Sequence, residues 1–135
     1  MGLFPYGEPN DNIPELFQTY NNTISLAKRD IFTPTYPNSA IVNVGLFDEL
    51  QYDADGDKTL LQNRRDMAYA IQTQTQAEVV KLIRKSVELT GKRDVVISGG
   101  YGLNCVANYH YLEALKDEDI NIYVEPISND AGTSI

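Results

Sequence analysis

Residues 94–108, D-V-V-I-S-G-G-Y-G-L-N-C-V-A-N, decide the fold. The first five are mostly β-branched and apolar, which predicts a short strand. Gly99, Gly100 and Gly102 then interrupt the chain, and from Leu103 the sequence is compatible with a helix. Glycines at such a corner let a phosphate approach the first amides of the helix, which carry a partial positive charge. The corner is therefore either an anion site or simply a tight turn.

The next segments extend this strand and helix into a βαβ unit. The helix is predicted over residues 103–115 and a second strand over residues 120–125, which ends before Pro126. The two strands should be parallel with a right-handed crossover, so both following loops should meet at the carboxyl edge of the sheet. The second loop carries Asp130, which could bind a metal or cap a helix, and Asn104 could likewise face a ligand or cap its own helix.

Two further regions complete the predicted α/β architecture. Apolar residues recur at three- and four-residue steps over residues 60–90, which predicts one long amphipathic helix that packs across the sheet and ends at Gly91. Five of the six prolines fall within residues 1–38, so this segment is predicted to be irregular, with one short helix over residues 15–28. Residues 40–47 are rich in β-branched residues and predict a strand or a buried apolar segment. We expect a single domain over the whole chain, 1–135, with its α/β core in residues 39–135.

Composition limits the function classes. A net charge of −8 would repel a nucleic acid, and no apolar run reaches the roughly 18 residues of a membrane span. The lone Cys105 cannot form an internal disulfide, and we expect it to be a small buried residue in a cytoplasmic protein. His110, the only histidine, is expected to be a packing or surface residue. The aspartates of residues 52–58 lack EF-hand spacing, which favours a solvated turn.

Three ordered motifs resemble those of the large O-carbamoyltransferases of the nodulation and antibiotic-tailoring type. They are M-G-L-F-P-Y-G at residues 1–7, S-G-G-Y-G-L-N-C-V-A-N at residues 98–108 and E-P-I-S-N-D-A-G-T-S at residues 125–134. Residues 65–68 and Gln72 fit the long helix between them. The resemblance implies one lobe of an actin-like (ribonuclease H-like) ATPase domain, related to the tRNA threonylcarbamoyl-transferring proteins.

The same resemblance implies a chemistry and a set of site residues. The parent protein would use carbamoyl phosphate and ATP, through a carbamoyl-adenylate, to carbamoylate a small hydroxyl acceptor. Gly99, Gly100, Gly102 and Asn104 would line the nucleotide, and Asp130 would bind a divalent metal, Fe or Mg. Other interpretations are another actin-fold ATP-dependent phosphotransferase, a tRNA threonylcarbamoyl-transfer relative, or a non-catalytic scaffold.

We expect the chain to be a fragment of such a protein. In the family a His-x-x-x-His metal pair precedes the opening motif, and a second domain that makes the adenylate follows. We therefore expect no carbamoyl transfer by this chain alone, and we leave open whether it binds ATP or metal by itself. Exposed strand edges and apolar faces predict a homo-oligomer.

Overall fold

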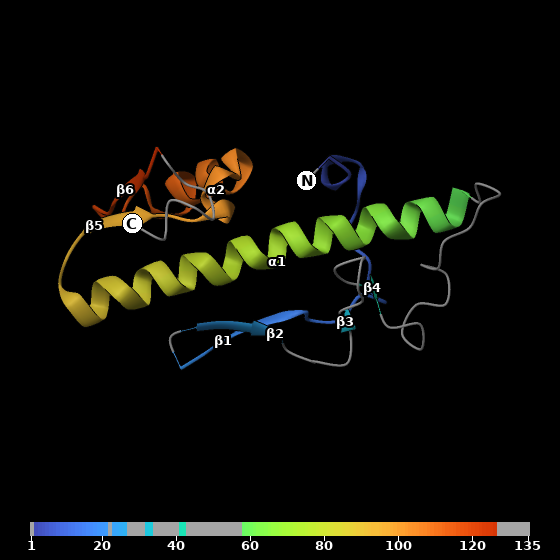
Figure 1. Cartoon of the computed structure of the whole chain (residues 1–135), viewed down its shortest axis with the longest axis horizontal. Coiled ribbons are helices and arrows are strands. Elements are labelled where there is room, and N and C mark those ends of the chain that lie inside the picture. Colours follow the sequence, from blue (N-terminus) through green and yellow to red (C-terminus); the bar gives the residue numbers. More distant parts are fainter. Residues whose placement is uncertain (1, 22, 27–31, 34–40, 43–57, 127–135) are drawn as a thin grey trace. The chain divides into compact units, whose positions relative to one another are not determined.

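The computed structural model describes residues 2–21, 23–26, 32–33, 41–42 and 58–126 (Figure 1). The chain divides into two compact units, one of residues 1–18 and 24–75 and one of residues 19–23 and 76–135. The expected single domain stays a prediction. The elements, in chain order, are η1 (Phe4–Tyr6), β1 (Phe17–Tyr20), β2 (Thr23–Leu26), β3 (Phe32–Thr33), β4 (Ile41–Val42), α1 (Lys58–Thr90), β5 (Asp94–Ile97), η3 (Gly100–Leu103), α2 (Cys105–Leu115) and β6 (Asn121–Val124).

The predicted short helix over residues 15–28 is wrong, because strands β1 and β2 form a two-stranded sheet there. The chain turns between them at Asn21, whose φ of 49° is a left-handed conformation that asparagine tolerates and that ends regular structure. The segment 1–38 is therefore less irregular than expected. Of the strand predicted over residues 40–47, the structure describes β4, which pairs antiparallel with β3; the rest lies outside the described residues.

The long helix is confirmed as α1, Lys58–Thr90. Gly91 ends it with a φ of 67°, and its amide donates to the carbonyl of Val87 at 2.8 Å, as expected of a glycine C-cap. The buried residues of α1 do not lie on one face, although the prediction of an amphipathic helix implied that they would. Met67 and Val80 are both 5% exposed, yet 13 residues place them about 220° apart around the helix axis. Opposite sides of α1 are therefore buried.

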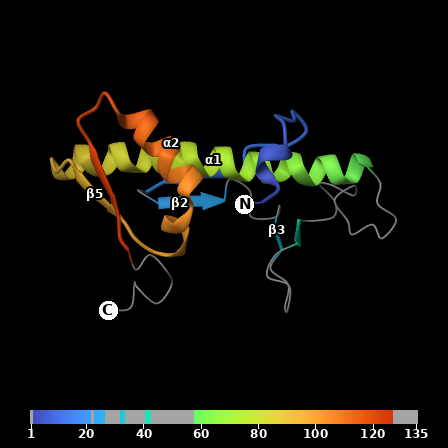
Figure 2. The ribbon, with the colours of Figure 1, turned by 90° about the horizontal axis from the view of Figure 1, so that it is seen from above.

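Each unit has its own core. In the first unit, Leu16 and Met67 are buried together. In the second, α1 packs against α2, and the two helices bury the cluster Val80, Ile83, Ala107, Tyr111 and Leu115. Figures 1 and 2 both show α2 beside the C-terminal part of α1. None of the helices in the described part of the chain has the length and apolar character needed to cross a membrane.

Strands β5 and β6 confirm the predicted βαβ unit. They pair in parallel, with Ile97 beside Val124 at the carboxyl end. One face of this sheet packs toward α2, while Val96 and Tyr123, which are neighbours in the register, lie on the other face and are 61% and 56% exposed. The described chain is thus mixed α/β with small sheets and a long helix, and the actin-like lobe remains a prediction.

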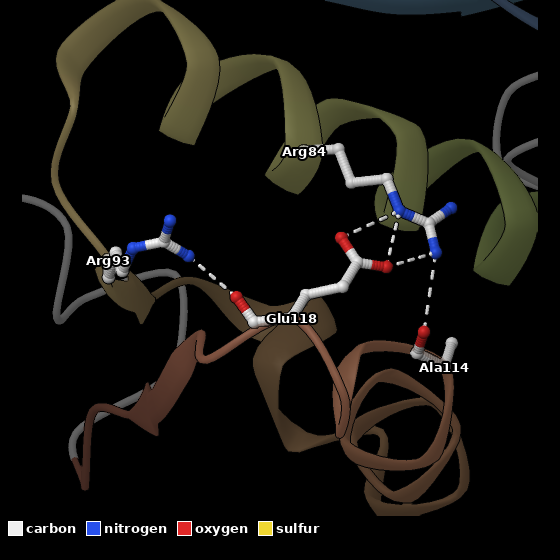
Figure 3. A network of polar contacts seen from close by, with 4 residues as sticks. All are labelled: Arg84, Arg93, Ala114 and Glu118. Atoms are coloured by element: carbon white, nitrogen blue, oxygen red, sulfur yellow. Dashed lines mark hydrogen bonds and ion pairs between the residues drawn. The ribbon is translucent and has the colours of Figure 1, made fainter.

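Two arginines hold the C-terminal end of α2 (Figure 3). The Arg84 guanidinium donates to the Glu118 carboxylate from Nε at 2.9 Å and from Nη2 at 2.6 Å, and it also donates to the carbonyl of Ala114 at 3.3 Å. Arg93 donates from Nη1 to the carbonyl of Glu118 at 2.6 Å. The Ala114 carbonyl lies in the last turn of α2 and has no intrahelical partner, so Arg84 satisfies a group that would otherwise depend on water. Arg93 does the same for a carbonyl in the turn that follows the helix.

Candidate functional site

The glycine corner, defined as residues 99–104, lies at the carboxyl end of β5. Gly99 has φ 94° and ψ 170°, a backbone conformation that residues with a Cβ rarely adopt. The tight helix η3 follows, in which the buried Gly102 donates its amide to the carbonyl of Gly99 at 2.9 Å. The sequence predicted a strand joined to a helix by glycines, and this is confirmed. It placed the helix start at Leu103, whereas α2 begins at Cys105 because η3 comes first.

Two asparagines fix the corner against α2. Asn104, only 2% exposed, caps the helix: its Oδ1 accepts the amide of Ala107 at 3.2 Å. This confirms the cap, while the predicted contact with a nucleotide stays a prediction. Asn108 donates from Nδ2 to the carbonyl of Gly102 at 2.8 Å. Sequence reasoning assigned Asn108 no role, although its position one helical turn after the cap was a usable signal.

The first turn of α2 offers the anion-binding groups of this corner. The amides of Cys105 and Val106 lie at the N-terminus of the helix, where backbone donors have no carbonyl four residues earlier within the helix. The helix dipole adds a partial positive charge at the same point. No lysine or arginine occurs in residues 98–108, so this segment itself offers an anion amides and no basic side chain. This arrangement suits a phosphate but predicts modest affinity.

The chain after β6 leaves from the same edge of the sheet. The ladder continues past the paired strands, because the amide of Glu125 donates to the carbonyl of Ile97 at 3.0 Å. The expectation that both loops start at one edge is therefore confirmed as far as Pro126. Asp130 lies outside the described residues, as do the aspartates within residues 52–58. Within the described residues, no group of three or more His, Cys, Asp or Glu side chains could hold a metal ion.

Two single-residue predictions had different outcomes. Cys105 is exposed, so the expectation of a buried residue is wrong. On α2 it lies about 120° from Tyr111, the middle residue of the buried face that Ala107 and Leu115 complete, as 100° per residue requires. His110 is an exposed residue of α2, which confirms a surface position.

The opening motif packs on α1 within the first unit. Gly7 lies so close to the helix that an added Cβ would stand 2.1 Å from the carbonyl oxygen of Arg65. The Phe4 ring stacks on Tyr69 with centroids 6.3 Å apart, and the Arg65 guanidinium lies 5.8 Å from the centroid of the Tyr6 ring. These contacts join the opening motif to α1, and the sequence analysis predicted no contact between these two segments.

Asp66 fastens the same segment to the helix. Its carboxylate is 6% exposed and accepts from the Glu8 amide at 3.0 Å, Asn10 Nδ2 at 3.1 Å and Gln62 Nε2 at 2.8 Å. Burial alone would raise the pKa of Asp66, but the hydrogen bonds from Glu8, Gln62 and Asn10 outweigh it and lower the pKa below its usual value. Asp66 is therefore an ionised structural anchor.

Comparison with known proteins gives the family. The family model for the carbamoyltransferase N-terminus matches residues 1–135. "Uncharacterized protein sll1178" of Synechocystis sp. (strain ATCC 27184 / PCC 6803 / Kazusa) is 32% identical over 142 residues, which cover 100% of this chain and 22% of that protein. "Nodulation protein NolNO" of Sinorhizobium fredii (strain NBRC 101917 / NGR234) is 25% identical over 138 residues, which cover 100% of this chain and 18% of that protein.

The chain thus spans about a fifth of the length of these curated relatives. No solved structure matches it significantly. The family match covers the opening motif, the long helix and the glycine corner together, as the resemblance of the three motifs predicted. The chain belongs to the carbamoyltransferase N-terminus family.

Proposed function

We propose that this chain forms part of the nucleotide site of a carbamoyltransferase, in which the glycine corner receives phosphates of ATP. Family membership supports the reaction class. The observation that carries the site is the geometry of the corner: Gly99 with a positive φ, followed by the open first turn of α2 at the carboxyl edge of a parallel sheet. Ligands of open α/β sheets collect at that edge.

The reaction proposed for the whole protein is transfer of a carbamoyl group from carbamoyl phosphate, through a carbamoyl-adenylate, to a small hydroxyl acceptor. In the last step the acceptor oxygen forms a bond to the carbamoyl carbon, the bond to AMP breaks, and the hydroxyl proton is lost. The part assigned to this chain is to bind and orient phosphates. Backbone amides fixed by Asn104 and Asn108 suit that task, because pre-positioned donors need no reorganisation when charge develops.

The metal belongs to the same proposal. A divalent ion, Fe or Mg, would be held in part by Asp130 and would supply positive charge that offsets the charge of the nucleotide phosphates. The described residues supply no complete ligand set, so further ligands would have to come from other groups. We therefore propose weak nucleotide binding by this chain and no carbamoyl transfer by it alone.

Titration calorimetry with ATP and Mg²⁺ or Fe²⁺ tests the proposal. Asn104→Asp is the sharpest variant, because aspartate caps a helix as well as asparagine does but brings a negative charge to the phosphates. We expect affinity to fall roughly fivefold or more. Asn21→Asp adds the same charge at an exposed turn that aspartate also tolerates, and we expect it to bind as the parent chain does.

Asp130→Ala separates the metal from the amides. If the metal and the backbone amides both bind ATP, Asp130→Ala should still bind ATP weakly, and this binding should no longer depend on the divalent ion. No heat with the parent chain under either metal would leave a purely structural corner, the scaffold interpretation. Equal affinity of the parent chain and Asn104→Asp would place the nucleotide away from the corner.

A further inference from the structure

A pocket of about 320 Å³ lies in the first unit, away from the glycine corner in the sequence. Its volume falls at the lower end of the roughly 300–1,000 Å³ typical of small-molecule sites. One wall is the loop after the opening motif and includes Asp11 and Ile13; the other is a stretch of α1 that includes Tyr69, Ala70, Thr73 and Gln74. Nothing in the proposed nucleotide site uses these residues.

Hydrogen bonds hold both walls in place. Asn10, which also lines the pocket, donates to Asp66 and accepts the amide of Asn12 at 3.0 Å. Gln74 accepts the amide of Leu16 at 2.6 Å and donates to the carbonyl of Pro14 at 3.2 Å. The loop is thus fixed to α1 at both ends of the pocket. A preformed site of this kind loses little entropy when a ligand binds.

The remaining polar groups of the pocket favour a ligand that donates hydrogen bonds and carries positive charge. The carboxylate of Asp11 makes no hydrogen bond or ion pair within the described part of the chain. The Thr73 hydroxyl donates to the carbonyl of Tyr69 at 2.9 Å, which leaves its oxygen able to accept. Among the described residues, no lysine, arginine or histidine lines the pocket, and Tyr69 contributes an aromatic ring, a group that attracts cations.

We propose that this pocket binds a small organic cation, with an ammonium or amidinium group at Asp11 and an apolar body against Ile13, Ala70 and the Tyr69 ring. The net charge of the chain, −8, also attracts cations over a long range. ATP and carbamoyl phosphate are anions that the Asp11 carboxylate repels. The pocket shares no residue with the proposed nucleotide corner, and this proposal does not depend on that one.

Three probes of one shape and different charge test the inference: cyclohexylammonium, cyclohexanol and cyclohexanecarboxylate. Amide chemical shifts of the isotope-labelled chain are followed by NMR during titration with each probe. We expect cyclohexylammonium to bind most tightly, cyclohexanol more weakly and the carboxylate not at all. Shifts should concentrate in residues 9–13 and 69–74.

Asp11→Asn removes the charge from an exposed position while it keeps the shape of the side chain. It should weaken cyclohexylammonium binding about two- to fivefold. Asp117→Asn, at an exposed site in the other unit, makes the net charge less negative by the same amount and should leave binding unchanged. Equal losses in the two variants, equal binding of the three probes, or shifts spread over the whole chain would each overturn the proposal.

Discussion

Replacement of Asp66 by alanine should release the opening segment from α1. The carboxylate accepts three hydrogen bonds in a buried position. The Glu8 amide is part of the backbone and loses its acceptor outright, whereas Gln62 and Asn10 can turn toward water. A buried donor without a partner costs about 1–3 kcal/mol, and hydrogen bonds to a charged group contribute more than those between neutral groups. We therefore expect Asp66→Ala to lower the free energy of unfolding by about 2–4 kcal/mol.

The effect should depend on pH with a defined sign. The pKa of Asp66 in the folded chain lies below the reference value of 3.8, so the stabilisation is complete above that value. It should be lost as the pH falls through the folded-state pKa. Asp66→Asn keeps the size of the side chain but cannot ionise. The difference in unfolding free energy between the parent chain and this variant should therefore shrink as the pH falls below about 3.8.

Urea unfolding followed by circular dichroism gives the free energies, and hydrogen exchange of the Glu8 amide reports the contact itself. Asp117→Asn is the control, since that carboxylate is exposed and should change stability little. A loss below about 0.5 kcal/mol for Asp66→Ala, or a Glu8 amide that keeps its protection, would refute the anchoring role.

Three further results are expected. Gly7→Ala should destabilise the chain by about 1–3 kcal/mol in urea unfolding, because its Cβ would meet the Arg65 carbonyl; a neutral effect would show that the segment does not sit on α1. Asn108→Ala should cost about 1 kcal/mol and speed hydrogen exchange around Gly102, whose carbonyl loses its donor; unchanged exchange would contradict that role. Sedimentation at roughly tens of micromolar should show a homo-oligomer that Val96→Asp dissociates, because Val96 is 61% exposed on the open sheet face; a monomeric parent chain would contradict this expectation.

Local signals in the sequence were enough to predict the second half of the described chain. The β-branched run before Gly99, the glycines and the periodicity of residues 60–90 each act over a few residues, and β5, α2 and α1 appear where these signals put them. The parallel pairing of β5 and β6 followed from the strand–helix–strand order alone. Asn104 was recognised as a possible cap because capping depends on the next three residues.

The first unit was predicted less well because its contacts join distant segments. Phe17, Tyr20 and Ile24 fit a helical spacing, yet they also favour strands, and the chain forms β1 and β2 with a left-handed Asn21 between them. The bond from Glu8 to Asp66 spans 58 positions, a distance over which a single sequence carries no pairing signal. Sequence reasoning consequently missed the contact between the opening motif and α1, and it also missed the pocket between α1 and the loop that follows this motif.

The most direct test of the central claim is an NMR titration of the isotope-labelled chain with ATP and Mg²⁺. If the glycine corner holds phosphates, amide shifts should concentrate between Gly99 and Val106 and should be lost in Gly99→Ala, because alanine rarely adopts the observed φ of 94°. Gly2→Ala is the matched control, since an added Cβ there meets nothing within 4 Å. Absence of shifts in this segment at millimolar ATP, or identical shifts in Gly99→Ala, would contradict the claim.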